Sequence, residues 1–143
     1  MRSRLILFVM SLLTFLLMAC GELKTPTNPG SGGDPIDPTA TFTRVQAEIF
    51  PTCTSITCHD TIGRSSDMIL LPNVAYTNIV NRPSVEMPQL NRITPNDPAN
   101  SYLYRKITGA GITGERMPLN KPPLSDAQIK LVRDWIRRGA PND

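Results

Sequence analysis

Two cysteines and a histidine form the part of the sequence with the clearest chemical potential. The segment from Cys53 to His59 reads CTSITCH, so a second thiol, Cys58, lies immediately before the only histidine of the chain. Thiols form thioethers, disulfides or bonds to metals, and imidazole is a common ligand of metals. This C-x4-C-H arrangement therefore predicts a cofactor site or a cross-link.

The order of these groups favours covalent attachment of haem. The usual c-type motif is C-x-x-C-H, in which the two thiols add to the two vinyl groups and the histidine binds the iron from the proximal side. Here the loop between the thiols is two residues longer, so the extra residues must bulge. We expect one covalent haem c, with thioethers from Cys53 and Cys58 and with His59 as the proximal ligand.

Other uses of these residues remain open. A disulfide between Cys53 and Cys58 is geometrically possible in an oxidising compartment. Zinc is disfavoured because two cysteines and one histidine are too few ligands for a closed structural site. A catalytic cysteine–histidine pair is disfavoured because the two residues are adjacent in the sequence and no orienting Asn or Asp constellation is evident.

The sixth iron ligand is expected from a methionine, since no second histidine exists. The methionines outside the predicted leader are Met68, Met87 and Met117. Met117 lies in a GERMP loop just before the last predicted helix, and a thioether raises the reduction potential relative to a second histidine. We expect Met117 as the distal ligand, with Met87 or an open site as alternatives.

The first 19 residues have the features of a secretory signal. Arg2 and Arg4 precede an apolar run from Leu5 to Ala19, which is too short to span a bilayer comfortably. A leader that holds both arginines also lowers the formal net charge from +3 to about +1 once it is removed. No stripe of Lys and Arg is left, so nucleic-acid binding is not expected.

The end of this leader, Leu17-Met18-Ala19-Cys20, resembles the bacterial lipobox. In that family of signals the cysteine is diacylated and becomes the first residue of the mature protein, which implies lipidation of Cys20. Gly21 follows, and the lack of Asp there resembles outer-membrane sorting. The resemblance implies a lipoprotein of the bacterial cell envelope, held at the outer membrane and facing the periplasm.

Residues 20–41 are predicted to form a flexible tether. Gly21 to Thr41 contains four Pro and four Gly and almost no large apolar residue, so it has little to bury. The folded domain is expected to span residues 42–143. A domain of this size with few apolar residues is expected to complete its core with something other than protein.

Four short helices are predicted in this domain, and no stretch alternates well enough for a strand. The first begins at Thr43, where Thr43 and Gln46 form a capping-box pattern, and stops at Pro51. The others run from about Asn73 to Val80, from Asp97-Pro98 to Gly109, and from the Ser125–Gln128 capping box to Gly139. The fold class is therefore all-α with long loops.

The order of these features resembles a small class I cytochrome c. More narrowly, it is similar to bacterial exported cytochrome c-like domains with an expanded haem motif. The segments that carry the similarity, besides the Cys-His segment, are AYTNIVN at 75–81, RITPNDP at 92–98, SYL at 101–103, RMP at 116–118 and DWIRRGAP at 134–141. The resemblance covers about residues 45–143.

The resemblance implies a cytochrome c-like fold, in which the first and last helices pack across each other beside the haem. Val45, Ile49 and Phe50 then need the apolar face of the last helix, which carries Ile129, Val132, Trp135 and Ile136. Three polar side chains are expected to bind the haem propionates: Arg92, Tyr102 and Arg105.

An iron with both His59 and Met117 as ligands has no position open for substrate. The expected function is one-electron transfer by a membrane-anchored cytochrome between redox partner proteins, and the chain is not expected to be an enzyme. Two alternatives remain. One is a haem-less cytochrome-like binding module with a Cys53–Cys58 disulfide, and the other is a haem enzyme such as a peroxidase with an open distal site.

Overall fold

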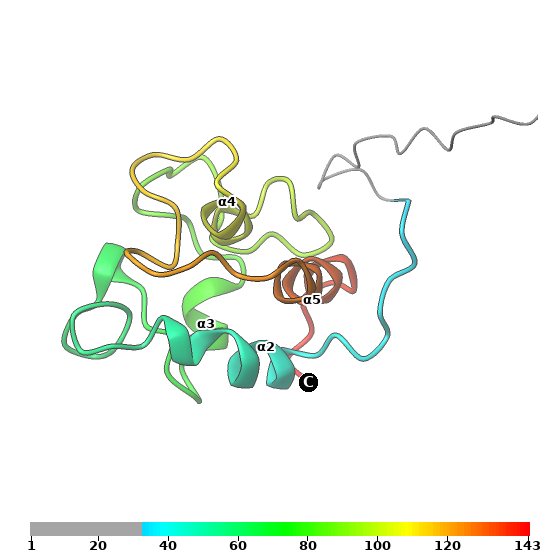
Figure 1. Cartoon of the computed structure of the whole chain (residues 1–143), viewed down its shortest axis with the longest axis horizontal. Helices are drawn as coiled ribbons and strands as arrows, with labels where there is room; N and C mark the ends of the chain where they lie inside the picture. The colour runs from blue at the N-terminus through cyan, green and yellow to red at the C-terminus, as the bar shows by residue number, and fades with distance from the viewer. Residues whose placement is uncertain (1–32) are drawn as a thin grey trace, which may run out of the picture. The chain divides into compact units, whose positions relative to one another are not determined.

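The structure, a computed structural model, describes residues 33–143. The predicted signal peptide 1–19, the predicted lipid site Cys20 and the predicted tether up to residue 32 lie outside the described residues. The described part contains four α-helices (Figure 1): α2 Phe42–Glu48, α3 Ala75–Ile79, α4 Tyr102–Thr108 and α5 Asp126–Arg137. Two short 3-10 turns, Phe50–Thr52 and Ser65–Asp67, precede α3.

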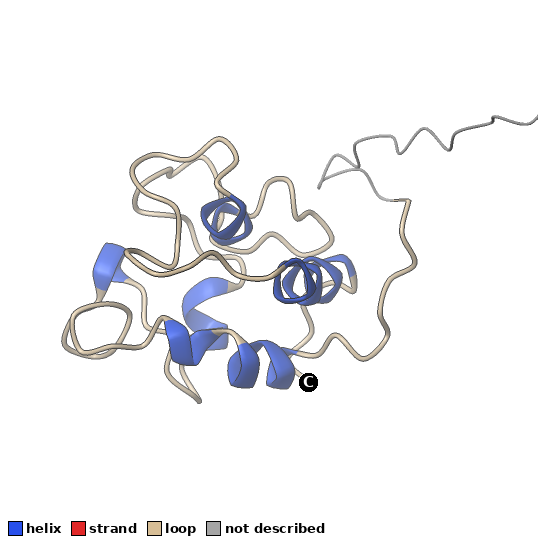
Figure 2. Cartoon of the chain, viewed as in Figure 1, coloured by secondary structure: helices blue, strands red, loops and turns tan. Residues whose placement is uncertain are grey.

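Long loops connect these helices, and residues 33–143 contain isolated bridges but no strand (Figure 2). The prediction of a small, mostly helical domain with four short helices and long loops is confirmed. None of the helices in the described part of the chain has the length and apolar character needed to cross a bilayer.

Helix α5 begins and ends where local signals predict. The Ser125 hydroxyl accepts the Gln128 N–H at 3.3 Å, and Gln128 Oε1 accepts the Ser125 N–H at 3.0 Å, which completes the capping box. After the helix the chain turns at Gly139, whose φ of 92° favours a residue without a side chain. Both ends of α5 were predictable because the residues that form each end lie within a few positions of one another.

Helix α2 begins earlier than predicted. Its N-cap is Thr41, whose hydroxyl accepts the Arg44 N–H at 3.2 Å. Thr43 lies inside the helix, and its hydroxyl donates to the Asp143 carbonyl at 2.7 Å. The prediction of a cap at Thr43 was wrong. The Thr43 hydroxyl bonds instead to Asp143, a partner 100 residues away that a local sequence pattern cannot reveal.

Helix α4 begins four residues after the predicted start at Asp97-Pro98. The Asp97 carboxylate caps a separate turn instead, in which Oδ1 accepts the Asn100 N–H at 3.1 Å. Ser101 is extended, with φ −96° and ψ 108°, and its hydroxyl accepts the Thr94 N–H at 2.9 Å. This non-local bond keeps Ser101 out of the helix, so α4 starts at Tyr102.

Helix α3 is shorter than the predicted Asn73–Val80. Asn73 has a φ of 68°, in the left-handed region, so it cannot belong to a right-handed helix. Val80 is extended and forms a bridge with Ile93. The helix is therefore confined to Ala75–Ile79.

The core lies between α2, α4 and α5, and α5 packs against the other two (Figure 1). At its centre the Phe42 ring lies 5.2 Å from the Tyr76 ring and 5.5 Å from the Trp135 ring. Trp135 is fully buried, and its Nε1–H donates to the Pro141 carbonyl at 2.9 Å. The predicted pairing of the apolar faces of the first and last helices is confirmed, because the predicted residues of both belong to one cluster.

The end of the predicted tether packs against α5. The Asp37 N–H donates to the buried Asp134 carboxylate at 3.1 Å, and Asp34 accepts a bond from Arg133 at 3.2 Å. Ala40 is fully buried, and its carbonyl accepts a bond from Arg138. Composition predicted a tether up to residue 41, but residues 34–41 find partners on α5 that composition does not reveal.

Candidate functional site

A cavity of about 400 Å³ brings together the residues predicted to hold a cofactor. Cys53, Cys58, His59 and Met117 all line it, although Met117 comes from a loop far away in the sequence. Much of the remaining wall is apolar, with Ile49, Phe50, Leu70, Leu103, Ile107 and Leu119. Apolar walls with a few polar groups are typical of cofactor sites of roughly 300–1,000 Å³.

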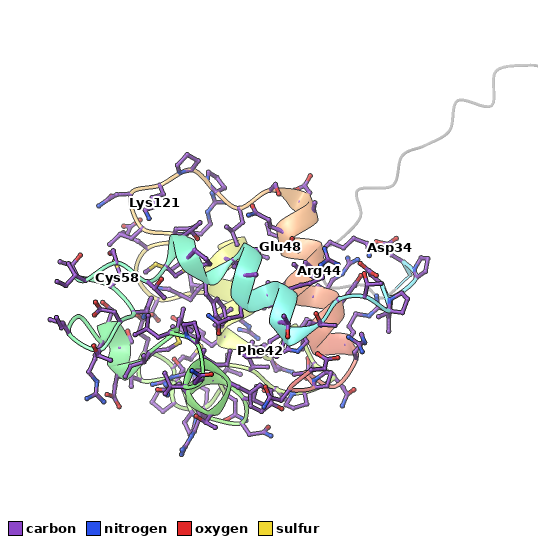
Figure 3. All side chains as sticks on the ribbon, turned by 90° about the horizontal axis from the view of Figure 1, so that it is seen from below. Asp34, Phe42, Arg44, Glu48, Cys58 and Lys121 are labelled. Carbon is purple, nitrogen blue, oxygen red and sulfur yellow. The ribbon has the colours of Figure 1, made fainter. Side chains whose placement is uncertain are left out.

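The longer loop between the two thiols is accommodated by a turn. The Cys58 N–H donates to the Ser55 carbonyl at 2.8 Å, and Ile56 lies exposed in the turn. The His59 N–H returns to the Cys53 carbonyl at 3.2 Å. The two extra residues thus bulge outward. The backbone bonds of Cys58 and His59 keep both residues close to Cys53. Figure 3 shows Cys58 in the loop that follows α2.

The two thiols are free, and the surroundings of Cys53 favour its protonated form. Burial raises the pKa of the Cys53 thiol, so it is protonated at neutral pH. Its sulfur lies 3.8 Å from the Ile49 carbonyl and 3.5 Å from the Thr52 hydroxyl. Reactive cysteines are instead found as thiolates beside positive charge or a general base.

His59 is almost fully buried and is held by a backbone carbonyl. Its Nδ1 lies 3.3 Å from the Met68 carbonyl, which only accepts, so Nδ1 carries the proton. Burial lowers the pKa of His59, which keeps the ring neutral at neutral pH. Nε2 then keeps its lone pair, and this is the arrangement in which a histidine binds a metal.

A tight turn holds the residues on either side of His59. Asp60 Oδ1 accepts the N–H groups of Ile62 at 2.8 Å and of Gly63 at 2.7 Å. A Cβ added to Gly63 would lie 2.6 Å from both the backbone N and the backbone O of Cys58. Only glycine allows the chain to approach Cys58 this closely.

Replacing Gly63 with alanine is therefore expected to displace Cys58 and to destabilise the domain by about 1–3 kcal/mol, the usual cost of forcing atoms into a packed site. Urea unfolding monitored by Trp135 fluorescence measures this change. Gly33→Ala is the control, since no heavy atom lies within 4 Å of its Cβ position. Equal stability of the two variants would contradict the expectation.

Met117 is presented to the cavity by the loop that follows α4. Its N–H donates to the Lys106 carbonyl at 2.9 Å, and Pro118 after it is buried. Farther along, Lys121 Nζ donates to the Thr52 carbonyl at 2.8 Å, beside the first thiol. Met87, the alternative ligand, does not line the cavity, whereas Met68 does.

Of the three residues predicted to bind propionates, two line the cavity and one does not. Arg92 lines it, but its Nη1 and Nη2 donate to backbone carbonyls, including that of Asn78 at 2.7 Å. Tyr102 lines it with its hydroxyl near Glu86. Arg105 lies elsewhere: its Nε donates to the Ala99 carbonyl at 2.6 Å, and it is absent from the cavity wall.

Sequence reasoning missed three charged residues at the cavity, Glu86, Lys106 and Lys121. Lys106 could have been found, because it lies one helical turn after Tyr102 and shares its face of α4. Glu86 lies in an irregular loop, so no periodicity places it. Lys106 Nζ lies 3.0 Å from Glu86 Oε2, and both groups are partly screened from solvent.

The donor set around the cavity fits an iron porphyrin. Two free thiols, a neutral imidazole and a thioether surround one space with apolar walls. Within residues 33–143, no three His, Cys, Asp or Glu side chains form a group suited to a metal ion. No protein-family model, curated protein or solved structure matches the chain.

Proposed function

We propose that this chain is a c-type cytochrome with one haem, which transfers single electrons in the bacterial cell envelope. One observation carries the proposal: the cavity gathers Cys53, Cys58, His59 and Met117, four residues with the chemistry needed to attach haem and to ligate its iron. The cavity is assembled from distant loops, which makes a chance grouping of this kind a poor explanation.

In this proposal Cys53 and Cys58 hold the haem by thioether bonds, and His59 and Met117 ligate the iron. Haem bound there supplies an iron that alternates between oxidation states one electron apart. The Met68 carbonyl favours the tautomer of His59 in which Nδ1 carries the proton and Nε2 the lone pair. The apolar wall excludes water, and Arg92 and Tyr102 provide donors for carboxylate groups.

Electron transfer is preferred over catalysis because the chain offers His59 and Met117 as two iron ligands and has no second histidine to act as a general acid or base. Lipidation at Cys20 would attach the protein to the outer membrane, on its periplasmic side. Its partners in this proposal are other redox proteins.

The decisive experiment is expression of the full chain in a bacterium with a c-type maturation system. We expect a red protein whose haem stays with the polypeptide after acidic organic extraction. A folded, colourless protein with a Cys53–Cys58 disulfide would overturn the proposal in favour of a haem-less module. A red protein that readily binds carbon monoxide would instead indicate an open distal site.

Replacing Met117 with alanine tests the second iron ligand. We expect the weak iron–sulfur charge-transfer band of the oxidised protein to disappear, because alanine offers no sulfur to the iron. Met87→Ala is the matched control, since Met87 does not line the cavity, and its band should match that of the unaltered protein. If the band survives in Met117→Ala and is lost in Met68→Ala, the ligand is Met68.

A further inference from the structure

One carboxylate, on the loop after α3, joins the Ser65–Asp67 turn to helix α4 at the side of the cavity. Glu86 Oε1 accepts the Ser66 hydroxyl at 2.9 Å, and Glu86 Oε2 accepts the Tyr102 hydroxyl and Lys106 Nζ, each at 3.0 Å. All four residues line the cavity. We call Glu86, Tyr102 and Lys106 the clasp.

The clasp also holds the loop that carries Met117. Lys106 Nζ donates to the Thr113 carbonyl at 3.1 Å, and the Tyr102 hydroxyl accepts the Thr113 N–H at 3.1 Å. The Lys106 carbonyl accepts the Met117 N–H at 2.9 Å. The loop is therefore bonded to α4 at two positions, and Lys106 takes part in both.

The part of the loop before Met117 has few other contacts. Most of residues 109–116 are exposed, and Gly109, Gly111 and Gly114 have positive φ values of 82°, 61° and 67°. Glycines leave the backbone many alternative conformations, so a loop of this kind opens easily unless it is bonded in place. The polar bonds of the clasp hold this part of the loop, while buried Pro118 and the bond from Lys121 to Thr52 hold the part after Met117.

Two members of the clasp are buried. Only 8% of Lys106 and 4% of Tyr102 are exposed, whereas the Glu86 side chain is 30% exposed. Lys106 Nζ is thus held against Glu86 Oε2 and the Thr113 carbonyl on the buried side of the loop.

We propose that Lys106, together with Tyr102 and Glu86, positions Met117 for the iron by fixing the 109–121 loop to α4. The proposal rests on the proposed function, in which Met117 is the second ligand. The clasp makes no bond to the iron itself and acts only through the loop.

The test compares Lys106→Leu with Arg105→Leu in the haem-loaded protein. Leucine keeps a good helix propensity, cannot donate to Glu86 or Thr113, and brings no sulfur to the cavity. In Lys106→Leu we expect the iron–sulfur band to fall at least about threefold while the haem stays covalently attached. Arg105, the preceding residue on α4, has side-chain bonds to the Ala99 carbonyl and to Asn100 and does not line the cavity, so its variant should keep the band. An undiminished band in Lys106→Leu would overturn the proposal.

Amide hydrogen exchange provides a second measurement that does not need haem. In Lys106→Leu the amides of Thr113 and Met117 are expected to exchange about tenfold faster, because the loop loses the bond from Lys106 Nζ to the Thr113 carbonyl and opens more often. Arg105→Leu should leave both exchange rates unchanged. If Lys106→Leu does not fold, Tyr102→Phe serves, and it should accelerate exchange of the Thr113 amide, whose acceptor is the Tyr102 hydroxyl. Unchanged exchange would overturn the role of the clasp, whereas a colourless wild-type protein would count only against the proposed function.

Discussion

Replacing both Cys53 and Cys58 with serine is expected to abolish covalent retention of haem. A serine hydroxyl does not add to a vinyl group, so no thioether forms. Serine differs from cysteine only in its side-chain oxygen, so the double variant should keep the cavity, which His59 and Met117 also line. Any haem that enters is held by those two residues alone and should leave the polypeptide on acidic organic extraction.

The third cysteine supplies the control. Cys20→Ser removes the predicted lipid site, which lies outside the described residues, and leaves the cavity unaltered. This variant should keep its full complement of covalent haem while losing membrane attachment. Each single variant, Cys53→Ser or Cys58→Ser, should retain haem through one thioether, with a shifted absorption spectrum. Full covalent haem in the double variant would show that these thiols do not attach it.

The parts of the fold that were predictable depend on neighbours in the sequence. The start of α5 was predicted because Ser125 and Gln128 bond to each other. The start of α4 was mispredicted because Ser101 bonds to Thr94, in a segment that no local pattern links to it. Local signals describe a helix end correctly only when its bonding partners are also local.

The candidate site divides in the same way. The segment from Cys53 to His59 was predictable from residue types and spacing, because haem attachment requires two thiols followed directly by a histidine. The sequence prediction named Arg105 and not Lys106, because it considered residue type and not helical phase. Tyr102 and Lys106 lie one turn apart on the cavity side of α4, and Arg105 does not share that face.

The order of segment 34–41 could not be predicted from composition, because its partners are side chains about 100 residues farther along the chain, among them one buried carboxylate. Asp134 is fully buried, and its carboxylate accepts bonds from Lys130 Nζ and from Arg133 Nε, in addition to the Asp37 N–H. A buried charge needs such partners, so this carboxylate joins α5 to the segment before α2.

Replacing Asp134 with alanine is accordingly expected to lower the free energy of unfolding by about 3 kcal/mol at neutral pH, near the low end of the cost of breaking a buried ion pair. The low end applies because 43% of the Lys130 side chain reaches solvent. Urea unfolding measures the loss. Asp126→Ala is the control on the same helix; that carboxylate is exposed in the first turn, so its removal should cost less than about 1 kcal/mol.

The pH dependence of the stability difference between the wild type and Asp134→Asn, which removes only the charge, shows how much of the loss comes from the charge of Asp134. Burial raises the pKa of Asp134, but hydrogen bonds from Lys130, from the Asp37 N–H and from Arg133 outweigh burial and leave that pKa below its usual value. A carboxyl group with a lowered pKa in the folded state stabilises the protein fully above the unfolded pKa of about 3.9, and this contribution is lost as the pH falls through the folded pKa. The unfolding free energies of the wild type and Asp134→Asn should therefore converge as the pH falls below about 4.

A third measurement links this charge to the segment before α2. If Asp134 holds that segment, limited proteolysis of Asp134→Ala should cut within residues 34–41 at protease concentrations that leave the wild type intact at the same sites, because the Asp37 N–H has lost its acceptor. Asp126→Ala should resist cleavage as the wild type does. A less stable Asp134→Ala whose segment 34–41 is still protected would mean that the carboxylate supports α5 alone, and that Ala40 and Arg138 suffice to hold the segment.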